Sequence, residues 1–381
     1  MLIYKKDKKH VLIFYNKKMS PYYAQHLSMH EKIILGGFYT PPDIIRKVEE
    51  MVKPFLNFDN LIIADLAGGC GAFILPFQHY NYRIADCDEK AVEYLKSYFN
   101  HQNVILTNSL TDVSRKKFNI PENSFLIIVG NPPYNDTTSE YKKGQKGNVI
   151  SDPDIYDRDL GISFLKVFNK LKADVICILH PLSYLIKEAN FKRLKSFACN
   201  YKLIESFIFP STKFKDTSEV SAFPVTISLY LRDKNGMSYD NIKNFRFKIL
   251  DDEKKTFIVS RYTTTDGYIN KYPPRKNDIM KESPLNIYYY SFRDLNSILR
   301  NASFIDKKYA NSVVVTLENL YKYAYLYVIK KLLKFKNKWL FGNMSPLVDI
   351  DYVESNKELM VYYVIKTHPF YQNLKEKLDI N

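Results

Sequence analysis

Short apolar runs alternate with helical patterns between residues 61 and 231. Runs of strand length occupy residues 61–65, 82–86, 103–107, 125–130, 174–180, 201–209 and 223–231, and amphipathic helical patterns occupy 88–100, 161–172 and 188–198. This alternation predicts an α/β fold with a doubly wound, mostly parallel, seven-stranded sheet and helices on both faces. The last two runs have no helix between them, which predicts a hairpin at one edge of the sheet.

The segment before the first strand predicts a helix with a clear start. In "GGFYTPPDIIRKVEEMV", Thr40 is a candidate N-cap, two prolines follow in the first turn, and Asp43 can accept hydrogen bonds from free backbone donors. Apolar residues then recur at helical spacing through Val52. Residues 74–80, "ILPFQHY", also suit a helix.

The alternation ends near residue 235, where "DKNGMSYDN" is rich in turn residues. Beyond this joint, basic and aromatic residues mix without a regular period, as in "NIYYYSFRDL". A chain of 381 residues suits two domains better than one. We therefore expect a ligand-binding catalytic domain over residues 1–235 and a second, mixed domain over residues 236–381.

The chain carries a large excess of positive charge, with 56 Lys and Arg against 41 Asp and Glu and a formal net charge of +15. Such a balance favours a polyanionic partner such as nucleic acid. A lysine-rich surface produced by a biased genome would look the same, because the lysines are spread along the chain. Charge alone leaves both interpretations open.

The four cysteines, Cys70, Cys87, Cys177 and Cys199, show no CxxC spacing and lie in apolar or strand-like contexts. This pattern favours buried free thiols over a disulfide framework or a metal site, as expected for an intracellular protein. No window approaches eighteen uninterrupted apolar residues, so we expect no membrane span.

A glycine-rich turn follows the first predicted strand and reads "DLAGGCGAF" from Asp65 to Phe73. Such a turn offers backbone donors to a nucleotide-like ligand at the carboxyl edge of a parallel sheet. It lacks the GxGxxG phosphate fingerprint, and Asp65 would repel a phosphate. A cationic or neutral ligand therefore fits this turn better.

The next two strands also end in polar residues. Asp86 ends the second strand, where a carboxylate commonly accepts hydrogen bonds from ribose hydroxyls, and Asp88 can cap the helix that follows. Asn108 follows the third strand, where its amide could contact an adenine edge or simply form a turn.

The stretch "LIIVGNPPYND", residues 126–136, runs from a buried strand into a rigid polar tip. The prolines fix the backbone and remove donors, which leaves carbonyl oxygens and the Asn131 amide oxygen as acceptors. Such a tip suits an amino group, and Tyr134 adds a flat face for an aromatic ring.

The motifs "GGFYTPPDII", "DLAGGCGAF" and "NPPY", in this order, resemble the S-adenosylmethionine-dependent DNA adenine methyltransferases of restriction-modification systems, in their gamma group. The similarity extends over about residues 30–235. It implies a Rossmann-like class I methyltransferase fold with S-adenosyl-L-methionine as cofactor. Two departures are Leu66, where proline or phenylalanine is more common, and Asn108, where an acid is more common.

The resemblance implies roles for the matching residues. The cofactor would be held by Phe38, Tyr39, Thr40, Pro41, Asp65, Ala67, Gly69, Gly71, Asp86, Cys87, Asn108, Ser109 and Asn131. Catalysis would depend on the tip residues Asn131, Pro132, Pro133 and Tyr134, with Asn131 and the Pro132 carbonyl accepting from the target amine. Tyr134 would stack on the flipped base, and Phe214 would cover its other face, although Phe209 and Phe223 are close by.

The resemblance also implies the substrate and the partners. The expected reaction is methylation of the exocyclic amine of a flipped adenine in a specific double-stranded DNA sequence, which protects it from a separate restriction endonuclease. We expect a monomer or weak dimer in the cytoplasm, associated with the nucleoid. Lys271–Lys276 and Lys330–Lys338 are candidate phosphate contacts, although a charge run can also be a plain solvated face.

Other functions remain open at this point. A methyltransferase acting on ribosomal RNA adenine or on a protein glutamine would share the NPPY motif. Pro153-Asp154 suggests a PD...ExK nuclease, but the later Glu253-Lys254-Lys255 is distant and is not expected in a strand. A DNA-binding module with an inactive cofactor site is a further alternative. The polar segment 135–161 is expected to be a loop that closes on DNA or a solvated insertion.

Overall fold

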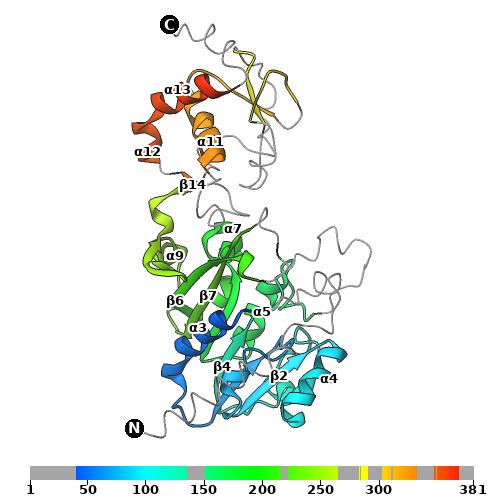
Figure 1. Cartoon of the computed structure of the whole chain (residues 1–381). Helices are drawn as coiled ribbons and strands as arrows, with labels where there is room; N and C mark the ends of the chain where they lie inside the picture. The colour runs from blue at the N-terminus through cyan, green and yellow to red at the C-terminus, as the bar shows by residue number, and fades with distance from the viewer. Residues whose placement is uncertain are drawn as a thin grey trace.

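The computed structural model describes residues 40–134, 151–214, 217, 222–264, 283, 285–290, 303–309, 312–332, 347–348 and 350–368. Figure 1 shows the course of the chain and its helices and strands. The expected cofactor residues Phe38 and Tyr39, the basic cluster Lys271–Lys276 and most of Lys330–Lys338 lie outside the described residues. The same holds for most of the predicted loop, residues 135–150.

A large sheet forms the centre of the first region (Figure 1). Its strand order is β3-β2-β1-β4-β5-β7-β6-β8-β9. Neighbours from β3 to β5 are parallel, and β7 runs antiparallel between β5 and β6. The strands are β1 (Leu61–Asp65), β2 (Tyr82–Asp86), β3 (Val104–Leu106), β4 (Phe125–Gly130), β5 (Val175–Pro181), β6 (Tyr201–Pro210), β7 (Pro224–Arg232), β8 (Phe247–Ile249) and β9 (Asp252–Phe257).

Apolar side chains are buried on both faces of this sheet, because alternate residues of each central strand point to opposite sides. In β4, Leu126 and Ile128 join one core with helix α5 (Leu160–Lys170), whereas Ile127 and Val129 join the other core with helices α3 and α4. Helix bounds on the two faces are α3 (Pro42–Val52), α4 (Glu89–Tyr98), α6 (Ser183–Ile186), α7 (Glu188–Arg193) and α8 (Lys195–Ala198). The mostly parallel α/β fold expected from the sequence is confirmed.

The start of helix α3 differs from the prediction. The N-cap position is occupied by Pro41, and no side chain caps the helix. The Thr40 hydroxyl instead accepts a hydrogen bond from the Asn131 amide, and Asp43 pairs with Lys213 at 3.0 Å. The expected helix at 74–80 is a single 3-10 turn, η3 (Leu75–Phe77).

The sheet continues beyond residue 235, where the joint was expected. Strand β8 pairs in parallel with β6, and β9 pairs antiparallel with β8, so the sheet has nine strands rather than seven. Helix α9 (Tyr239–Asn244) and Phe257 add apolar side chains to the same core. The predicted hairpin of β6 and β7 exists but lies inside the sheet, and the charged strand β9 is the outermost strand on that side.

The later residues form smaller elements with a core of their own. A three-stranded antiparallel sheet has the order β12-β11-β13, and strand β10 pairs with β14. The elements are β10 (Thr263–Thr264), β11 (Tyr288–Tyr290), β12 (Phe304–Ile305), β13 (Ser312–Val314), α11 (Leu320–Leu332), β14 (Leu347–Val348), α12 (Ile350–Ser355) and α13 (Lys357–Thr367). Within the described parts of the chain, no helix is long and apolar enough to span a membrane.

Candidate functional site

The candidate site lies where strands β1, β2 and β4 end. These strands are parallel neighbours, so their carboxyl ends meet at one edge of the sheet. This edge carries Asp65 at the end of β1, Asp86 at the end of β2, and Asn131 directly after β4. Three of the polar positions expected from the sequence are therefore brought together by the strand order alone.

The glycine turn, residues 66–71, follows β1 and is held by backbone hydrogen bonds. The Gly68 amide donates to the Ala85 carbonyl at 3.0 Å, and the Gly71 amide donates to the Gly68 carbonyl at 2.7 Å. Gly71 has φ +79°, and a Cβ there would lie 2.4 Å from the Phe99 ring. The turn is tight, and at Gly71 it packs closely against the end of helix α4, so only glycine fits at this position.

Asp86 is held by backbone donors on both sides. Its Oδ2 accepts from the Gly69 amide at 2.8 Å, and its Oδ1 accepts from the Asp88 amide at 3.0 Å. Burial raises the pKa of Asp86, while these two hydrogen bonds act in the opposite direction. Asp88 caps helix α4 by accepting from the Lys90 amide, as its capping interpretation predicted. Asp86 is thus fixed in place, and each oxygen keeps further acceptor capacity.

Asp65 is buried, and only one of its oxygens has a partner. Oδ1 accepts from the Ala67 amide at 3.2 Å, whereas Oδ2 has no hydrogen-bond partner among the described residues. Burial raises the pKa of Asp65 to about 7, and the nearby Asp86 carboxylate adds to the effect. A buried carboxylate without a partner is costly, so this oxygen is suited to a cationic group of a ligand.

The tip, residues 131–134, approaches this carboxylate closely. Gly130 has φ +149°, and a Cβ there would lie 2.7 Å from Asp65 Oδ1. Any larger residue would press on the carboxylate, so glycine is required where β4 leads into the tip. The two halves of the site, the glycine turn and the tip, therefore meet at Gly130.

Asn131 holds its amide oxygen without a partner. Its Nδ2 donates to the Thr40 hydroxyl across 3.5 Å, which orients the amide. Its Oδ1 is buried and has no hydrogen-bond partner among the described residues. Pro132, which follows, is buried and has no amide hydrogen. The tip therefore presents an acceptor that a donor from a ligand or substrate can satisfy.

Two aromatic rings stand together beside the tip. Tyr134 and Phe223 are partly exposed and meet edge to face, with ring centroids 6.4 Å apart and an interplanar angle of 85°. Phe214, predicted to stack on a base, is 2% exposed and packs in the core against Phe209. Its ring faces the interior, where it forms part of a core with side chains of β6 and β7. In this conformation the partly exposed ring beside Tyr134 is Phe223, the alternative considered from sequence.

The expected adenine contacts form a turn. Asn108 Oδ1 accepts from the Leu110 amide at 3.0 Å, so the turn-forming interpretation of Asn108 is confirmed. The Ser109 hydroxyl donates to the Leu66 carbonyl at 2.6 Å and ties this loop to the glycine turn.

All four cysteines are free. The prediction of burial is correct for Cys177 but wrong for Cys87 and Cys199, which are exposed.

The nuclease interpretation gains no support from these contacts. Glu253 does lie in a strand, β9, contrary to expectation. However, Glu253 pairs with Lys47 at 2.7 Å, and Asp154 pairs with Lys170 at 3.0 Å, so both carboxylates belong to surface ion pairs. No group of three or more His, Cys, Asp or Glu side chains suited to a metal ion occurs among the described residues.

Comparisons with known proteins point to methyltransferases. A family model described as Eco57I restriction-modification methylase matches residues 68–214, which contain residues 68–71 of the glycine turn, the tip and Phe214. This match is to less than half of the chain. The chain is thus similar over this region to restriction-modification methylases, as the motifs predicted. A search of curated protein sequences found no match.

Among the solved structures that match this chain, several are described as methyltransferases or restriction-modification proteins. The cryoEM structure of a DrdV–DNA complex is 14% identical, covers 65% of this chain and 30% of that chain, and has a TM-score of 0.40. A type I restriction-modification methyltransferase subunit from Streptococcus thermophilus is 15% identical, with coverages of 52% and 45% and a TM-score of 0.37. The 23S rRNA methyltransferase ErmE is 12% identical, with coverages of 53% and 72% and a TM-score of 0.35. Values this low assign no role to any residue.

Proposed function

We propose that this protein transfers a methyl group from S-adenosyl-L-methionine to the exocyclic amine of an adenine in duplex DNA. The observation that carries the proposal is the buried, unpartnered Oδ1 of Asn131 at the end of β4. It lies in a region that matches a restriction-modification methylase family model. The positive charge of the chain suits a DNA substrate.

The residues of the glycine turn fit the cofactor. The unpartnered Oδ2 of Asp65 suits its ammonium group, the fixed Asp86 carboxylate suits its ribose hydroxyls, and Ala67, Gly69 and Gly71 bring backbone close to it. Cys87, Asn108 and Ser109 would border its adenine and ribose, with Thr40 and Pro41 near its methionine end. When bound, S-adenosylmethionine supplies a methyl group on a sulfonium centre.

At the tip, the target amine would meet two acceptors. Adenine's amine is a poor nucleophile because its lone pair is delocalised into the ring. Asn131 Oδ1 and the Pro132 carbonyl would accept hydrogen bonds from its two N–H groups, which favours a tetrahedral nitrogen whose lone pair is localised and points at the methyl group. The two prolines keep these acceptors in place, so alignment provides most of the catalysis. The amine releases a proton after the transfer, when that proton has become strongly acidic, so no dedicated general base is required.

Inside a duplex the amine is paired, so the base must be flipped out of the stack. Tyr134 offers a face for the flipped base, and the adjoining edge of Phe223 can close the pocket beside it. Both rings are partly exposed, whereas Phe214 is buried in the core. Tyr134 and Phe223 are therefore the proposed pair of base-holding aromatics.

The proposal is tested by supplying tritium-labelled S-adenosylmethionine with unmethylated plasmid DNA, ribosomal RNA or cell protein in separate reactions. Label is expected in DNA alone, and digestion to nucleosides should yield N6-methyladenine. The Asn131→Ala variant is the control and should transfer label about 10²- to 10³-fold more slowly. Label confined to RNA or protein would instead support the ribosomal RNA or glutamine alternatives. Failure of the wild-type chain to bind the cofactor would leave only a binding module.

Sequencing of DNA from expressing cells, with detection of modified bases, would then give the recognition sequence. We expect the C-terminal region to read this sequence and to contact phosphates, and a separate endonuclease to cut the same sequence when it is unmethylated. A monomer or weak dimer suffices for this reaction, because every proposed site residue lies on one chain.

A further inference from the structure

Gly161, in the first turn of helix α5, lies against both the tip and a buried tyrosine. A Cβ placed on Gly161 would lie 2.5 Å from the Tyr184 hydroxyl and 3.1 Å from the Tyr134 Cβ. Both tyrosines therefore lie against the bare Cα of Gly161, with no room for a side chain. The position of Tyr134 is set by how closely helix α5 approaches it.

Tyr184 fixes that approach through its own contacts. It is 1% exposed, and its ring is stacked on His180, with centroids 5.5 Å apart and planes 8° apart. Its hydroxyl donates to Asp159, and burial together with this carboxylate raises the pKa of Tyr184 well above its usual value. Asp159 Oδ1 also accepts from the Gly161 amide at 3.1 Å. One carboxylate oxygen thus joins Tyr184 to the start of α5.

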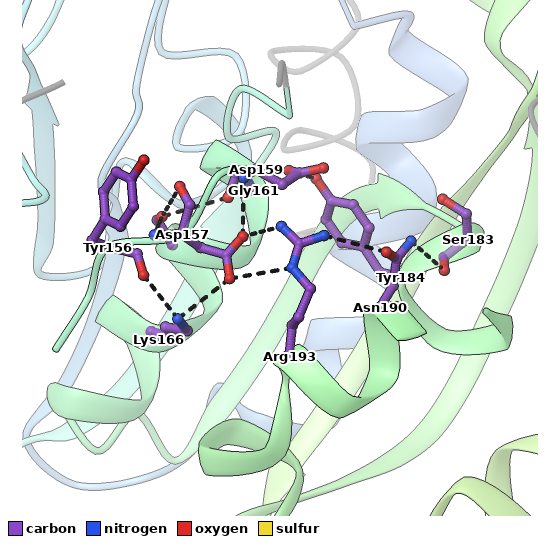
Figure 2. A network of polar contacts seen from close by, with 10 residues as sticks. Tyr156, Asp157, Asp159, Gly161, Lys166, Ser183, Tyr184, Asn190 and Arg193 are labelled. Carbon is purple, nitrogen blue, oxygen red and sulfur yellow. Dashed lines mark hydrogen bonds and ion pairs between the residues drawn. The ribbon is translucent and has the colours of Figure 1, made fainter. Parts of the chain in front are cut away.

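A second set of charges holds the chain just before this point (Figure 2). Asp157 pairs with Arg193 on α7 and with Lys166 on α5, the latter at 3.4 Å. Its Oδ1 accepts from the Asp159 amide at 3.0 Å, and these cations and donors hold the pKa of Asp157 below its ordinary value despite burial. Figure 2 shows Arg193 and Tyr184 approaching Asp157 and Asp159 from the α6–α7 side. The segment is fixed by α5, α6 and α7 together.

We propose that Gly161 and Tyr184, joined through Asp159, are positioning residues that set the place of the Tyr134 ring for the target base. This proposal rests on the proposed function for its effect on catalysis. None of the three residues needs to touch the base or the cofactor. A general role in helix stability does not explain glycine here, because alanine is a better helix former than glycine. The close approach of Tyr184 and Tyr134 does explain it.

The test is a double-mutant cycle between Gly161→Ala and Tyr134→Ala in the full chain, with unmethylated plasmid DNA and labelled S-adenosylmethionine. Gly161→Ala alone should lower kcat/KM for DNA by about 10- to 100-fold, the effect of misplacing a contact by roughly 1 Å. Cofactor affinity should stay within about twofold. In the Tyr134→Ala background the same change should have little effect, because the ring it displaces is absent. Tyr184→Phe, which keeps the ring and removes the hydroxyl, should follow the same pattern more weakly.

Val167→Ala is the matched control. Val167 is buried in the core face of α5, six residues or about 9 Å along the helix from Gly161. The Val167→Ala substitution weakens the packing of the same helix away from Tyr134. Its effect on kcat/KM should therefore add to that of Tyr134→Ala. Additive effects for Gly161→Ala as well would overturn the positioning role.

A structural measurement separates this proposal from the proposed function. A crystal structure of Gly161→Ala should show the Tyr134 ring displaced relative to the wild-type protein, whatever the substrate is. An unmoved ring would disprove the positioning role. Loss of all methyl transfer by the wild-type chain, with the ring displaced in the variant, would disprove the proposed function and leave the positioning intact.

Discussion

The glycine turn and the tip form opposite sides of one site, and they are built on different principles. The turn is held by backbone hydrogen bonds and lies beside two carboxylates: Asp86 accepts from two amides, and Asp65 has one oxygen without a partner among the described residues. The tip is held by prolines and packing, and it offers a neutral amide oxygen from Asn131. The turn is therefore suited to recognising charge, whereas the tip is suited to recognising the geometry of an uncharged amine.

The largest effect is expected at the tip. Asn131→Ala removes the acceptor that orients the amine and should lower kcat by about 10²- to 10³-fold, as for loss of one preorganised polar contact. Cofactor affinity, measured by calorimetry, should change by less than about twofold. Asn131→Asp keeps an acceptor at this position and should retain more activity than Asn131→Ala. A large loss of cofactor affinity in Asn131→Ala would show that the tip also binds the cofactor, and would contradict the separate roles of the glycine turn and the tip.

The next effect is expected at the turn. Asp65→Asn removes the charge but keeps the shape, and should weaken cofactor binding by about 10- to 100-fold, the range for one hydrogen bond to a charged group. The kcat at saturating cofactor should change little. Asp88→Asn is the matched control, because Asp88 caps helix α4 and asparagine caps equally well. Equal cofactor affinity in Asp65→Asn and wild type would contradict the assignment of Asp65.

The same carboxylate predicts a dependence on pH. In the free protein the pKa of Asp65 is about 7, raised from 3.8 by burial, so the folded state holds this proton more tightly than the unfolded state. Its ionisation therefore lowers stability as pH rises from about 4 to 7. A cationic ligand prefers the ionised form, so cofactor affinity should rise with pH up to about 7 and then level off. The slope cannot exceed about tenfold per pH unit, and Asp65→Asn should abolish it.

Substitution of the two candidate aromatic residues, Phe223 and Phe214, should affect different properties: catalysis for Phe223 and stability for Phe214. Phe223→Ala should lower kcat/KM for DNA by about tenfold, as for loss of a contact to a stacked base, with little change in stability. Phe214→Ala should lower the free energy of unfolding by about 3 to 5 kcal/mol, because it leaves a cavity in the core. Denaturant titration and steady-state kinetics separate these outcomes. A stable, catalytically impaired Phe214→Ala would favour Phe214 as the base contact.

The smallest effect is expected for Asp88→Ala. Loss of the cap on helix α4 should lower stability by about 1 kcal/mol in denaturant titration. Cofactor affinity should be unchanged, since Asp86 keeps its bond from the Gly69 amide. A marked loss of affinity would instead give Asp88 a direct part in the cofactor site.

Much of the fold was predictable, because each central strand is a short apolar run that ends in turn residues. Strands β1, β2 and β4 occupy the predicted residues. Strand β9 was missed, because its sequence "DEKKTF" is charged and mostly exposed and has no apolar period. Strand propensity is weak evidence for such an edge strand, whose pairing depends on the neighbour it meets.

The site was predictable where one strand end decides a position, and not where distant segments meet. Asp65, Asp86 and Asn131 follow from strand ends. The prediction that Thr40 caps helix α3 was wrong, because the N-cap is Pro41. The Thr40 hydroxyl instead accepts a hydrogen bond from Asn131, a residue far away in the sequence. The choice between Phe214 and Phe223 depends on which ring the core needs. The approach of Gly161 to Tyr184 has no signal in the sequence beyond a glycine near a helix start.

The charged edge strand β9 has a consequence for how the protein behaves in solution at high concentration. An outermost strand presents unpaired backbone groups on which another chain could add a strand and start aggregation. In β9 a run of charged residues, Glu253 to Lys255, is exposed at this edge. An added chain would have to bury these charges or bring its own charges against them. Strand β9, which the sequence pattern did not reveal, thus hinders the addition of a strand from another copy of the chain to this edge of the sheet.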